Sequence, residues 1–349
     1  MTALTVPAQP HTDDGLRPVP WRRMAWVTWR QHRMSLAGIA GLFGVAAVYL
    51  LITGLQMRHA YAAVAACHPA SSGACQQAAG NFLSTYLPAA GAVLGLLQAA
   101  PALIGAFAGA PLLAREFEAG TFRYTWTQGF GRARWTIAKL IPLAVTVSAA
   151  AGAFSALVSW YIQPLWAAGD DNGPLYPTIF DLRGIALAAW TLTAFAIGVM
   201  AGIAIRRVIP AMFATLAAYA GLAFVTGAFL RPRYERPLLS TDPNFHTRSW
   251  VISQLWTRGG KPASLSAINQ TFAPIDIRAV TSGLWQPGPS TPANIDPVRY
   301  LVRHGYVQLT TYQPDSRFWT FQWIEGGWLI ALSLVLIVAT VWLVRRRAT

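Results

Sequence analysis

Six long runs of apolar residues, separated by more polar stretches, dominate the pattern of this chain. Each run approaches or exceeds the roughly 20 apolar residues that an α-helix needs to cross the hydrocarbon core of a bilayer. A single soluble core has no room for six such segments, so we expect six membrane-spanning helices. Their approximate bounds are 35–55, 87–110, 136–162, 184–205, 209–230 and 327–344.

Arginines lie at the ends of these runs, on one side of the expected membrane. Five arginines precede the first run, Arg206 and Arg207 separate the fourth from the fifth, and three more follow the sixth. Short basic loops stay in the cytoplasm. We therefore expect a multi-pass plasma-membrane protein with both termini cytoplasmic, including residues 1–34 and the basic tail that closes the segment 327–349.

The segment 20–34 combines arginines with tryptophans before the first run. At the helical period its arginines gather in one sector, while the apolar side chains lie away from it. This arrangement favours a helix that lies in the cytoplasmic interface of the membrane. The alternative is an ordinary flanking segment with no helix of its own.

The segment 231–326 has a different composition, rich in proline, serine, threonine and asparagine. Two runs within it, 249–256 and 305–312, alternate enough to predict β-strands. A helix start near Asp315 or Ser316 then leads into the last apolar run. We expect a small extracytoplasmic domain of mixed structure between the fifth and sixth spans.

Cys67 and Cys75 fall together in the first outer loop and are the two cysteines of the chain. In an oxidising compartment this spacing allows a disulfide. Two idle thiols, or a metal-binding pair, remain the alternatives. A metal pair would lack further ligands, since His68 alone is nearby.

Composition supports the membrane interpretation and excludes other classes. Only 11% of the 349 residues are charged, against about 25% in soluble domains, and the mean hydropathy is +0.39. The net charge of +14 does not indicate nucleic-acid binding, because the arginines form no continuous patch. The chain has no phosphate-binding loop and no catalytic or metal motif, so we do not expect an enzyme.

Carboxylates are missing from the interiors of all six expected spans. Ion-driven transporters use intramembrane carboxylates or histidines as relays, so this absence argues against proton or sodium coupling.

Glycines four residues apart recur in the second and fourth spans. This spacing allows two helices to approach closely, and we favour such a packing role over a gate or a substrate-lining kink. The pairs are Gly91 with Gly95, Gly105 with Gly109, and Gly198 with Gly202; Gln98 and Pro101 lie between the first two pairs.

The stretch 114–135 interrupts the apolar pattern with charges and glycines. Gly120 can end one helix and Thr121 can cap a new, short one. Phe122 and Trp126 then offer apolar groups for the groove of a partner. The alternative is a solvated re-entry loop whose aromatic side chains lie in the interface.

This stretch resembles the intracellular coupling helix of ABC-2 type permeases, whose pattern is Glu-x-Gly-Thr followed by a Gly/Arg turn and a Lys. The matching residues are Glu118, Gly120, Thr121, Arg132 and Lys139, with Glu116 just upstream. The order of an interfacial helix, six spans and an outer segment between the fifth and sixth spans is similar too.

The resemblance implies the permease subunit of an ATP-driven transporter that exports a small molecule, a drug-like compound or a lipid. ATP and Mg²⁺ would bind to a separate ABC ATPase, with no cofactor in this chain. Two copies of the chain, surrounded by membrane lipid, would pair with two ATPase subunits. The residues implied in coupling are Glu116, Glu118, Gly120, Thr121, Phe122, Trp126 and Arg132; the two glutamates would meet basic residues of the ATPase, and the two aromatics would enter its groove.

The expected fold class is thus an all-α polytopic membrane protein with a small mixed outer domain. The domains expected along it are the N-terminal segment 1–34, spans one to five in 35–230, the outer domain 231–326, and the last span with its tail in 327–349. A rival function of another class is a membrane-anchored sensor or assembly protein whose outer domain binds a ligand.

Overall fold

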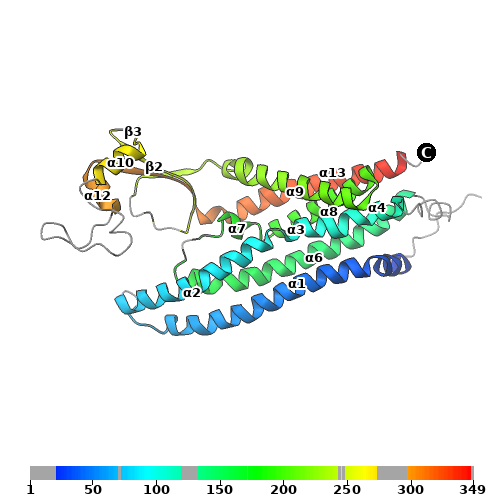
Figure 1. Ribbon diagram of the computed structural model, residues 1–349, viewed down its shortest axis with the longest axis horizontal. Helices are drawn as coiled ribbons and strands as arrows, with labels where there is room; N and C mark the ends of the chain where they lie inside the picture. The colour runs from blue at the N-terminus through cyan, green and yellow to red at the C-terminus, as the bar shows by residue number, and fades with distance from the viewer. Residues whose placement is uncertain are drawn as a thin grey trace, which may run out of the picture.

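The computed structural model describes residues 21–69, 72–118, 132–170, 172–242, 245, 248–272 and 297–346. Long helices form an elongated bundle, and a small sheet domain lies at one end of it (Figure 1). We call this the sheet end. The opposite end, where Arg206, Arg207, Arg345 and Arg346 lie, is the arginine end.

The first half of the bundle contains three long helical stretches: the single helix α1, a stretch made of four successive helical elements, and the single helix α6. They are α1 (Trp21–Ala65), then α2 (Gly73–Leu97), α3 (Ala100–Ile104), the π-helix η1 (Gly105–Gly109) and α4 (Ala110–Glu118), and then α6 (Arg132–Ala167). The second half contains α7 (Pro177–Phe180), α8 (Ala186–Ile205), α9 (Val208–Val225), the π-helix η2 (Thr226–Leu230), the 3₁₀-helices η3 (Arg231–Arg233) and η4 (Asp315–Arg317), and α13 (Phe318–Arg346).

Within the described residues, five helical stretches are long and apolar enough to cross a membrane: Gly73–Glu118, Thr136–Ala167, Ala186–Ile205, Val208–Arg233 and Asp315–Arg346. They contain the second to sixth predicted spans almost entirely, so the polytopic helical fold is confirmed. The first predicted span, 35–55, lies inside α1. The basic segment before it continues into α1 without a break in the helix, rather than ending as a separate element.

Helix α8 is the centre of the bundle. Most of its side chains are buried, and they join the apolar clusters that connect it with α6, α9, α13 and the α3–α4 stretch. By contrast, α9 buries only Ala211, Thr215 and Tyr219 among its residues. An evenly apolar helix such as α9 is stable with one face toward lipid, whereas α8 is covered by protein on most sides.

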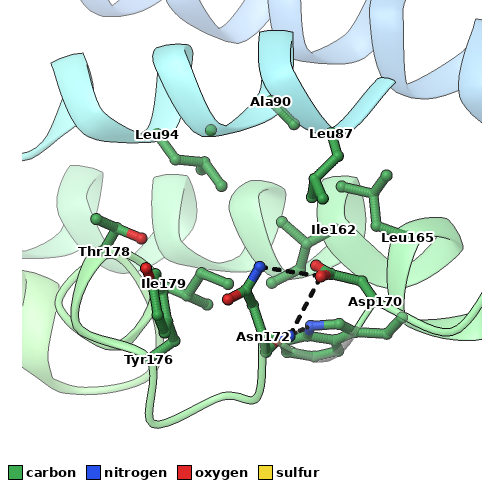
Figure 2. A pocket seen from close by; sticks show the side chains of 12 residues that line it. Leu87, Ala90, Leu94, Ile162, Leu165, Asp170, Asn172, Tyr176, Thr178 and Ile179 are labelled. Carbon is green, nitrogen blue, oxygen red and sulfur yellow. Dashed lines mark hydrogen bonds between the residues drawn. The ribbon is translucent and has the colours of Figure 1, made fainter. Parts of the chain in front are cut away.

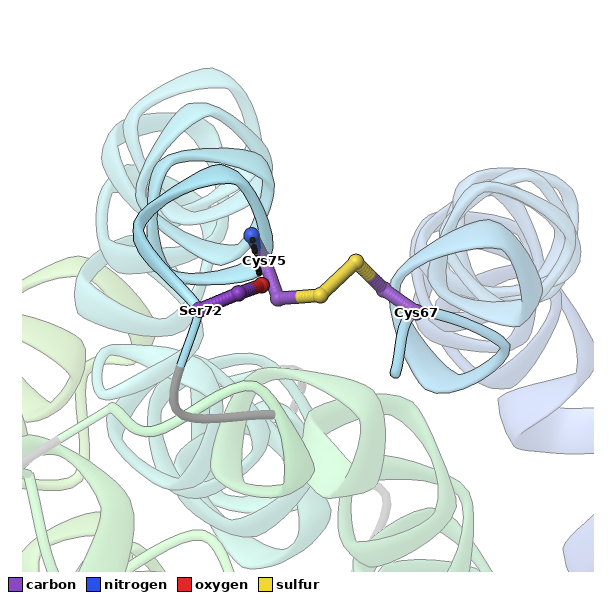
Figure 3. Close-up of a disulfide and its surroundings, with 3 residues drawn as sticks. All are labelled: Cys67, Ser72 and Cys75. Atoms are coloured by element: carbon purple, nitrogen blue, oxygen red, sulfur yellow. Dashed lines mark hydrogen bonds between the residues drawn. A yellow bond between two sulfur atoms is a disulfide. The ribbon is translucent and has the colours of Figure 1, made fainter. Parts of the chain in front are cut away.

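Helices α1 and α2 form a hairpin that a disulfide closes at the sheet end (Figure 3). The Cα atoms of Cys67 and Cys75 are 5.6 Å apart, within the usual range for this bond. The Ser72 hydroxyl caps α2 by accepting a hydrogen bond from the Cys75 backbone N–H at 3.3 Å. The cap and the disulfide together fix where α2 begins.

The outer segment contains a four-stranded antiparallel sheet in the order β1-β4-β2-β3. The strands are β1 (Leu238–Ser240), β2 (Trp250–Arg258), β3 (Lys261–Pro262) and β4 (Tyr306–Gln313). Helices α10 (Leu265–Phe272) and α12 (Pro297–Arg303) pack against it through an apolar cluster around Tyr306. The two strands predicted from alternation, now β2 and β4, are confirmed and pair with each other.

The sheet domain is packed onto the bundle. Trp250, at the start of β2, lies in the same buried cluster as Phe318 of α13 and Trp190 of α8. A side chain at Gly173, in the loop between α6 and α7, would overlap the Arg248 carbonyl just before β2. The domain and the sheet end of the bundle therefore share one interface.

Candidate functional site

The stretch expected to couple the chain to an ATPase follows the last turn of α4 and precedes the first turn of α6, and both of these turns lie at the arginine end (Figure 1). Four of its expected coupling residues, Gly120, Thr121, Phe122 and Trp126, lie outside the described residues. Arg132 is the first residue of α6. The structure describes the residues on both sides of the stretch. We call the end of α4, Glu116–Glu118, and the start of α6, Arg132–Lys139, the frame.

An ion pair joins the two sides of this frame. The Lys139 ammonium of α6 donates a hydrogen bond to the Glu116 carboxylate of α4. Lys139 is only 2% exposed and Glu116 17% exposed, so the pair is largely shielded from solvent. Buried ions are stable only when paired, so this contact ties the entry of the stretch to its exit.

The pair gives Glu116 a partner within its own chain. From the sequence, its carboxylate was expected to meet a basic residue of the ATPase. In the structure the carboxylate contacts Lys139, 23 positions later, and its contact with an ATPase stays a prediction. In the sequence, Lys139 matched the lysine of the ABC-2 type pattern.

Glu118, the last residue of α4, connects the frame to the turn between α8 and α9. Its carboxylate accepts a hydrogen bond from the Val208 backbone N–H at 3.2 Å, where α9 begins. A carboxylate at a helix N-terminus satisfies a free backbone donor and complements the helix dipole. Glu118 is exposed, so its side chain is accessible at this end of the bundle.

Arg206 strengthens the same connection. It ends α8 in the left-handed conformation, with φ of 61°, which is unusual for a residue with a side chain. Its guanidinium lies 5.8 Å from the centre of the Phe117 ring of α4. Through the residues from Glu116 to Glu118, the end of α4 therefore contacts α6, α8 and α9.

A comparison with known protein families identifies the class of protein to which this chain belongs. A family model described as ABC-2 membrane transporter related matches residues 40–231. The chain belongs to this family. No curated protein and no solved structure matches it. The chain is thus a membrane transporter permease, and the matched range contains the whole of the stretch 114–135 and its frame.

In this ABC-2 permease, close helix contacts connect the frame to the centre of the bundle. A Cβ added at Gly109 of η1 would lie 2.6 Å from the Phe195 carbonyl oxygen of α8, and one at Gly202 of α8 would lie 2.5 Å from the Ala110 carbonyl oxygen of α4. Gly105 and Gly198 meet the facing backbone even more tightly. The packing role predicted for these two glycine pairs is confirmed.

The remaining pair, Gly91 and Gly95 of α2, does not lie against another helix. A Cβ at Gly91 or at Gly95 would meet nothing within 4 Å, so the predicted packing role is wrong for this pair within the described chain. The helix also breaks after Leu97, and Gln98 there donates a hydrogen bond to the Thr178 carbonyl at 2.7 Å. Pro101 lies in the first turn of α3, where a missing N–H costs nothing.

A buried ionic cluster lies at the sheet end of the permease, and the sequence did not reveal it. Arg231 donates to both carboxylate oxygens of Glu325, at 2.9 and 2.6 Å, and also to Asp181. Arg231 is 2% and Glu325 0% exposed. Trp190 and Tyr234 donate to the same Glu325 carboxylate at 2.8 and 3.1 Å.

This cluster corrects the expectation that no carboxylate lies within a span. Glu325 belongs to the candidate span Asp315–Arg346, whereas the pattern placed it in the outer domain. The helix start at Asp315 was the available signal, because it places Glu325 well inside a helix. Desolvation raises the pKa of Asp181 to about 6, against the attraction of the Arg231 guanidinium.

The cluster joins parts of the chain that are distant in sequence. Arg231 is the last residue of the family match, Glu325 is one of the buried residues of α13, and Asp181 follows α7. Nearby, the Gln322 side chain accepts a hydrogen bond from the Ala186 N–H at 2.8 Å and donates one to the Phe180 carbonyl at 3.2 Å. These contacts fix α13 to α8 at the sheet end.

Proposed function

We propose that this chain is the permease subunit of an ATP-driven exporter and that residues 114–135 receive the movement of a separate ABC ATPase. The observation that carries the coupling part is the largely buried Lys139–Glu116 pair. A solvated re-entry loop needs no shielded ion pair at its base. A segment that transmits force needs its two ends held together, as this pair holds them.

The contacts of the frame support a route for that movement. Displacement of the stretch acts on α4 and α6 through Glu116 and Lys139, and on the start of α9 through Glu118. Helix α4 in turn lies backbone to backbone against α8 near Gly202. Since packed interfaces shift between discrete arrangements rather than deforming continuously, a shift of α4 requires α8 to move with it.

In this proposal the arginine end faces the cytoplasm of a cell whose plasma membrane holds the permease. Two copies of the chain and two ATPase subunits form the transporter, and ATP with Mg²⁺ binds to the ATPases alone. Glu118 and the basic turn at Arg206 remain available to the ATPase, and Phe122 with Trp126 supply apolar anchors. Glu116 acts inside the frame rather than at the contact.

The decisive experiment combines the chain with a candidate ABC ATPase, chosen by its Walker motifs from the reading frames beside that of the permease. Co-purification and the ATP hydrolysis rate are measured in lipid nanodiscs for the wild type and for Phe122→Ala with Trp126→Ala. Truncation of an interface anchor costs about 2 kcal/mol or more, which weakens a complex about thirtyfold. We expect the double variant to insert normally but to lose the ATPase.

Trp323→Ala is the matched control, because Trp323 is 66% exposed and lies in α13 near the sheet end. It should retain the ATPase fully. Full ATPase association by the double variant would contradict the coupling assignment. A wild-type chain that binds no ATPase, and does not change its hydrolysis rate, would instead favour a membrane-anchored sensor.

A further inference from the structure

A cavity of about 240 Å³ lies inside the helical bundle, between α1, α3, α6 and α8. We call it the α3 cavity. Its lining residues in α3, α6 and α8 belong to helical stretches that are long and apolar enough to cross a membrane. Its lining residues in α1 fall within the first predicted span, 35–55. The α3 cavity is therefore surrounded by membrane-spanning segments.

The α3 cavity lies where the second span is irregular. Helix α2 ends at Leu97, α3 begins at Ala100, and the π-helix η1 follows Ile104. Ala100 and Ile104 both line the cavity. The π-helix is held against α8, because a Cβ added at Gly105 would lie 2.4 Å from the Ala194 carbonyl oxygen. Space remains on the other side of this stretch, toward α1, and π-helical turns are frequent at functional sites.

The α3 cavity is open on one side and closed at one end. Ala37 and Ala40 of α1 and Ala150 of α6 line it and are exposed. The rings of Phe43 and Phe154 meet edge to face, with their centres 5.5 Å apart, and both line the end of the cavity nearer the sheet end. The open side therefore runs along α1 and α6, where a membrane-embedded bundle meets the acyl chains of the bilayer.

The walls of the α3 cavity carry no charge. Around it, the four helices contain no charged residue and no histidine over residues 34–57, 97–114, 140–167 and 184–205. The polar side chains among its described lining residues are Thr146 and Thr191. Each donates its hydroxyl hydrogen, at 2.7 Å, to a carbonyl one turn earlier in its own helix. A charged ligand would find no counter-ion here, and an unpaired charge is costly to bury.

The volume of the α3 cavity limits the size of a ligand. It exceeds the roughly 150 Å³ of an apolar cavity that holds benzene. It is smaller than the roughly 300 Å³ at which pockets for drug-sized ligands begin. A molecule of one or two fused rings has the size that this range allows.

A second cavity, of about 280 Å³, has walls of another kind and lies between α2, the end of α6 and the loop that follows α6 (Figure 2). Leu87 and Leu94 of α2 form its apolar side. On the opposite side the Asn172 amide donates a hydrogen bond to the Asp170 carboxylate at 3.0 Å. Polar walls of this kind suit water or hydrogen-bonding groups, so the α3 cavity is the better site for an apolar molecule.

We propose that the α3 cavity binds a compact, uncharged apolar molecule of one or two rings, which enters from the acyl chains of the bilayer. The inference rests on the proposed function in one respect, since it names the substrate class of the exporter. The binding itself needs only this chain. The competing occupant is a phospholipid acyl chain. Such a chain extends over half of the roughly 30 Å hydrocarbon core, so a cavity of this volume, closed at one end, takes only part of it.

The test uses the purified chain in lipid nanodiscs without any ATPase. The probe is trifluoromethylphenyldiazirine, a one-ring apolar compound that loses N₂ on illumination and leaves a carbene, which inserts into a nearby C–H bond. Mass spectrometry locates the labelled residues, with and without excess naphthalene. We expect labelling of residues 146–154 that saturates and that naphthalene displaces. Phe213, which is 67% exposed on α9, should be labelled without saturation or displacement.

Two variants fill the α3 cavity from opposite walls without changing charge. Ala150→Phe on α6 and Ala40→Phe on α1 should each abolish the displaceable labelling and leave the labelling of Phe213 unchanged. Ala149→Phe is the matched control. Ala149 is exposed on the same helix but is not among the described residues that line the cavity, so this variant should be labelled like the wild type.

A second arm distinguishes the bilayer as the source of the occupant. Nanodiscs are prepared with a phospholipid that carries the diazirine in its acyl chain. We expect this lipid to label Phe213 more strongly than residues 146–154. The opposite result would assign the α3 cavity to an acyl chain and overturn the inference, as would labelling that naphthalene does not displace, or labelling that persists in Ala150→Phe and Ala40→Phe.

Failure of the proposed function has a different signature. A chain that binds naphthalene in this pattern, but with an ATPase whose hydrolysis rate naphthalene does not change, keeps the apolar site and loses the exporter. A chain that associates with an ATPase but shows no displaceable labelling keeps the coupling and loses the site.

Discussion

Replacing Arg231 by methionine removes a guanidinium that contacts Glu325 and Asp181 while leaving both carboxylates in place. The methionine stem fills part of the same space, so the change acts mainly on charge and hydrogen bonding. The Glu325 side chain is 0% exposed, so bulk solvent does not replace the lost donors. The variant therefore tests whether the ionic cluster holds α13 to the rest of the bundle.

The expected loss of unfolding free energy in Arg231→Met follows from the burial of the ion pair. Removing one partner of a buried ion pair typically costs about 3–5 kcal/mol, because a charge is left without compensation. Trp190 and Tyr234 still donate to Glu325, so we expect a loss of about 3 kcal/mol rather than more. Glu325→Gln should cost less, because the amide oxygen still accepts hydrogen bonds and Arg231 keeps Asp181.

The assay is an SDS titration of the purified chain, followed by far-UV circular dichroism, which gives an unfolding free energy for each variant. Arg233→Met is the matched control on the same short helix. Arg233 is exposed, and its guanidinium bonds only to the Phe229 carbonyl, at 2.8 Å, among the described contacts. A surface substitution of this kind changes stability by about 0.5 kcal/mol or less.

Equal unfolding free energies for Arg231→Met and Arg233→Met would refute the reasoning. The ionic cluster would then contribute nothing to the unfolding free energy, and the packing of α13 against the bundle would depend on the apolar clusters alone. A loss confined to Arg231→Met, and absent from Arg233→Met, supports the cluster as the tie between α13 and the family-matched part of the chain.

Three further predictions test orientation, the disulfide and the frame. In a cysteine-free background, a cysteine at Gln128 should resist impermeant thiol reagents in intact cells and one at Asn269 should react; the reverse pattern would invert the topology. Native protein should show no free thiol before reduction, whereas Cys67→Ser should expose one by mass-spectrometric alkylation; two labelled thiols in unreduced wild type would exclude the bond. Lys139→Glu, which brings two carboxylates together, should lower ATPase stimulation severalfold, and adding Glu116→Lys should restore it; no recovery in the double variant would mean that the pair does not act as a pair.

The apolar runs and the alternating strands were predictable because each depends on residues close in sequence. Twenty consecutive apolar residues have few stable environments outside a bilayer, and the alternation in β2 and β4 marks a sheet whatever its partners are. The glycine pairs also carried a readable signal, but only two of the three lie against another helix. Spacing states that a close approach is possible, not that a neighbour is present.

The ionic contacts were not predictable, because they join residues that are far apart in the chain. Arg231 and Glu325 are separated by 94 positions, and Arg231 and Asp181 by 50. In a hydropathy pattern, each charged residue is taken as the end of a membrane-spanning segment. A charged residue that is paired with an opposite charge can nevertheless lie within such a segment. The same limit applies to Lys139, whose partner Glu116 lies on the other side of the polar stretch.

Because α1 is long, a small tilt of this helix produces a large displacement at the disulfide that joins it to α2. Twenty residues separate the middle of its apolar part from Ala65, which is about 30 Å at the helical rise of 1.5 Å per residue. A tilt of about 10° therefore displaces the tip by about 5 Å. Because Cys67 is bonded to Cys75, the start of α2 must follow that displacement, and a reduced hairpin would let the two helices swing apart independently.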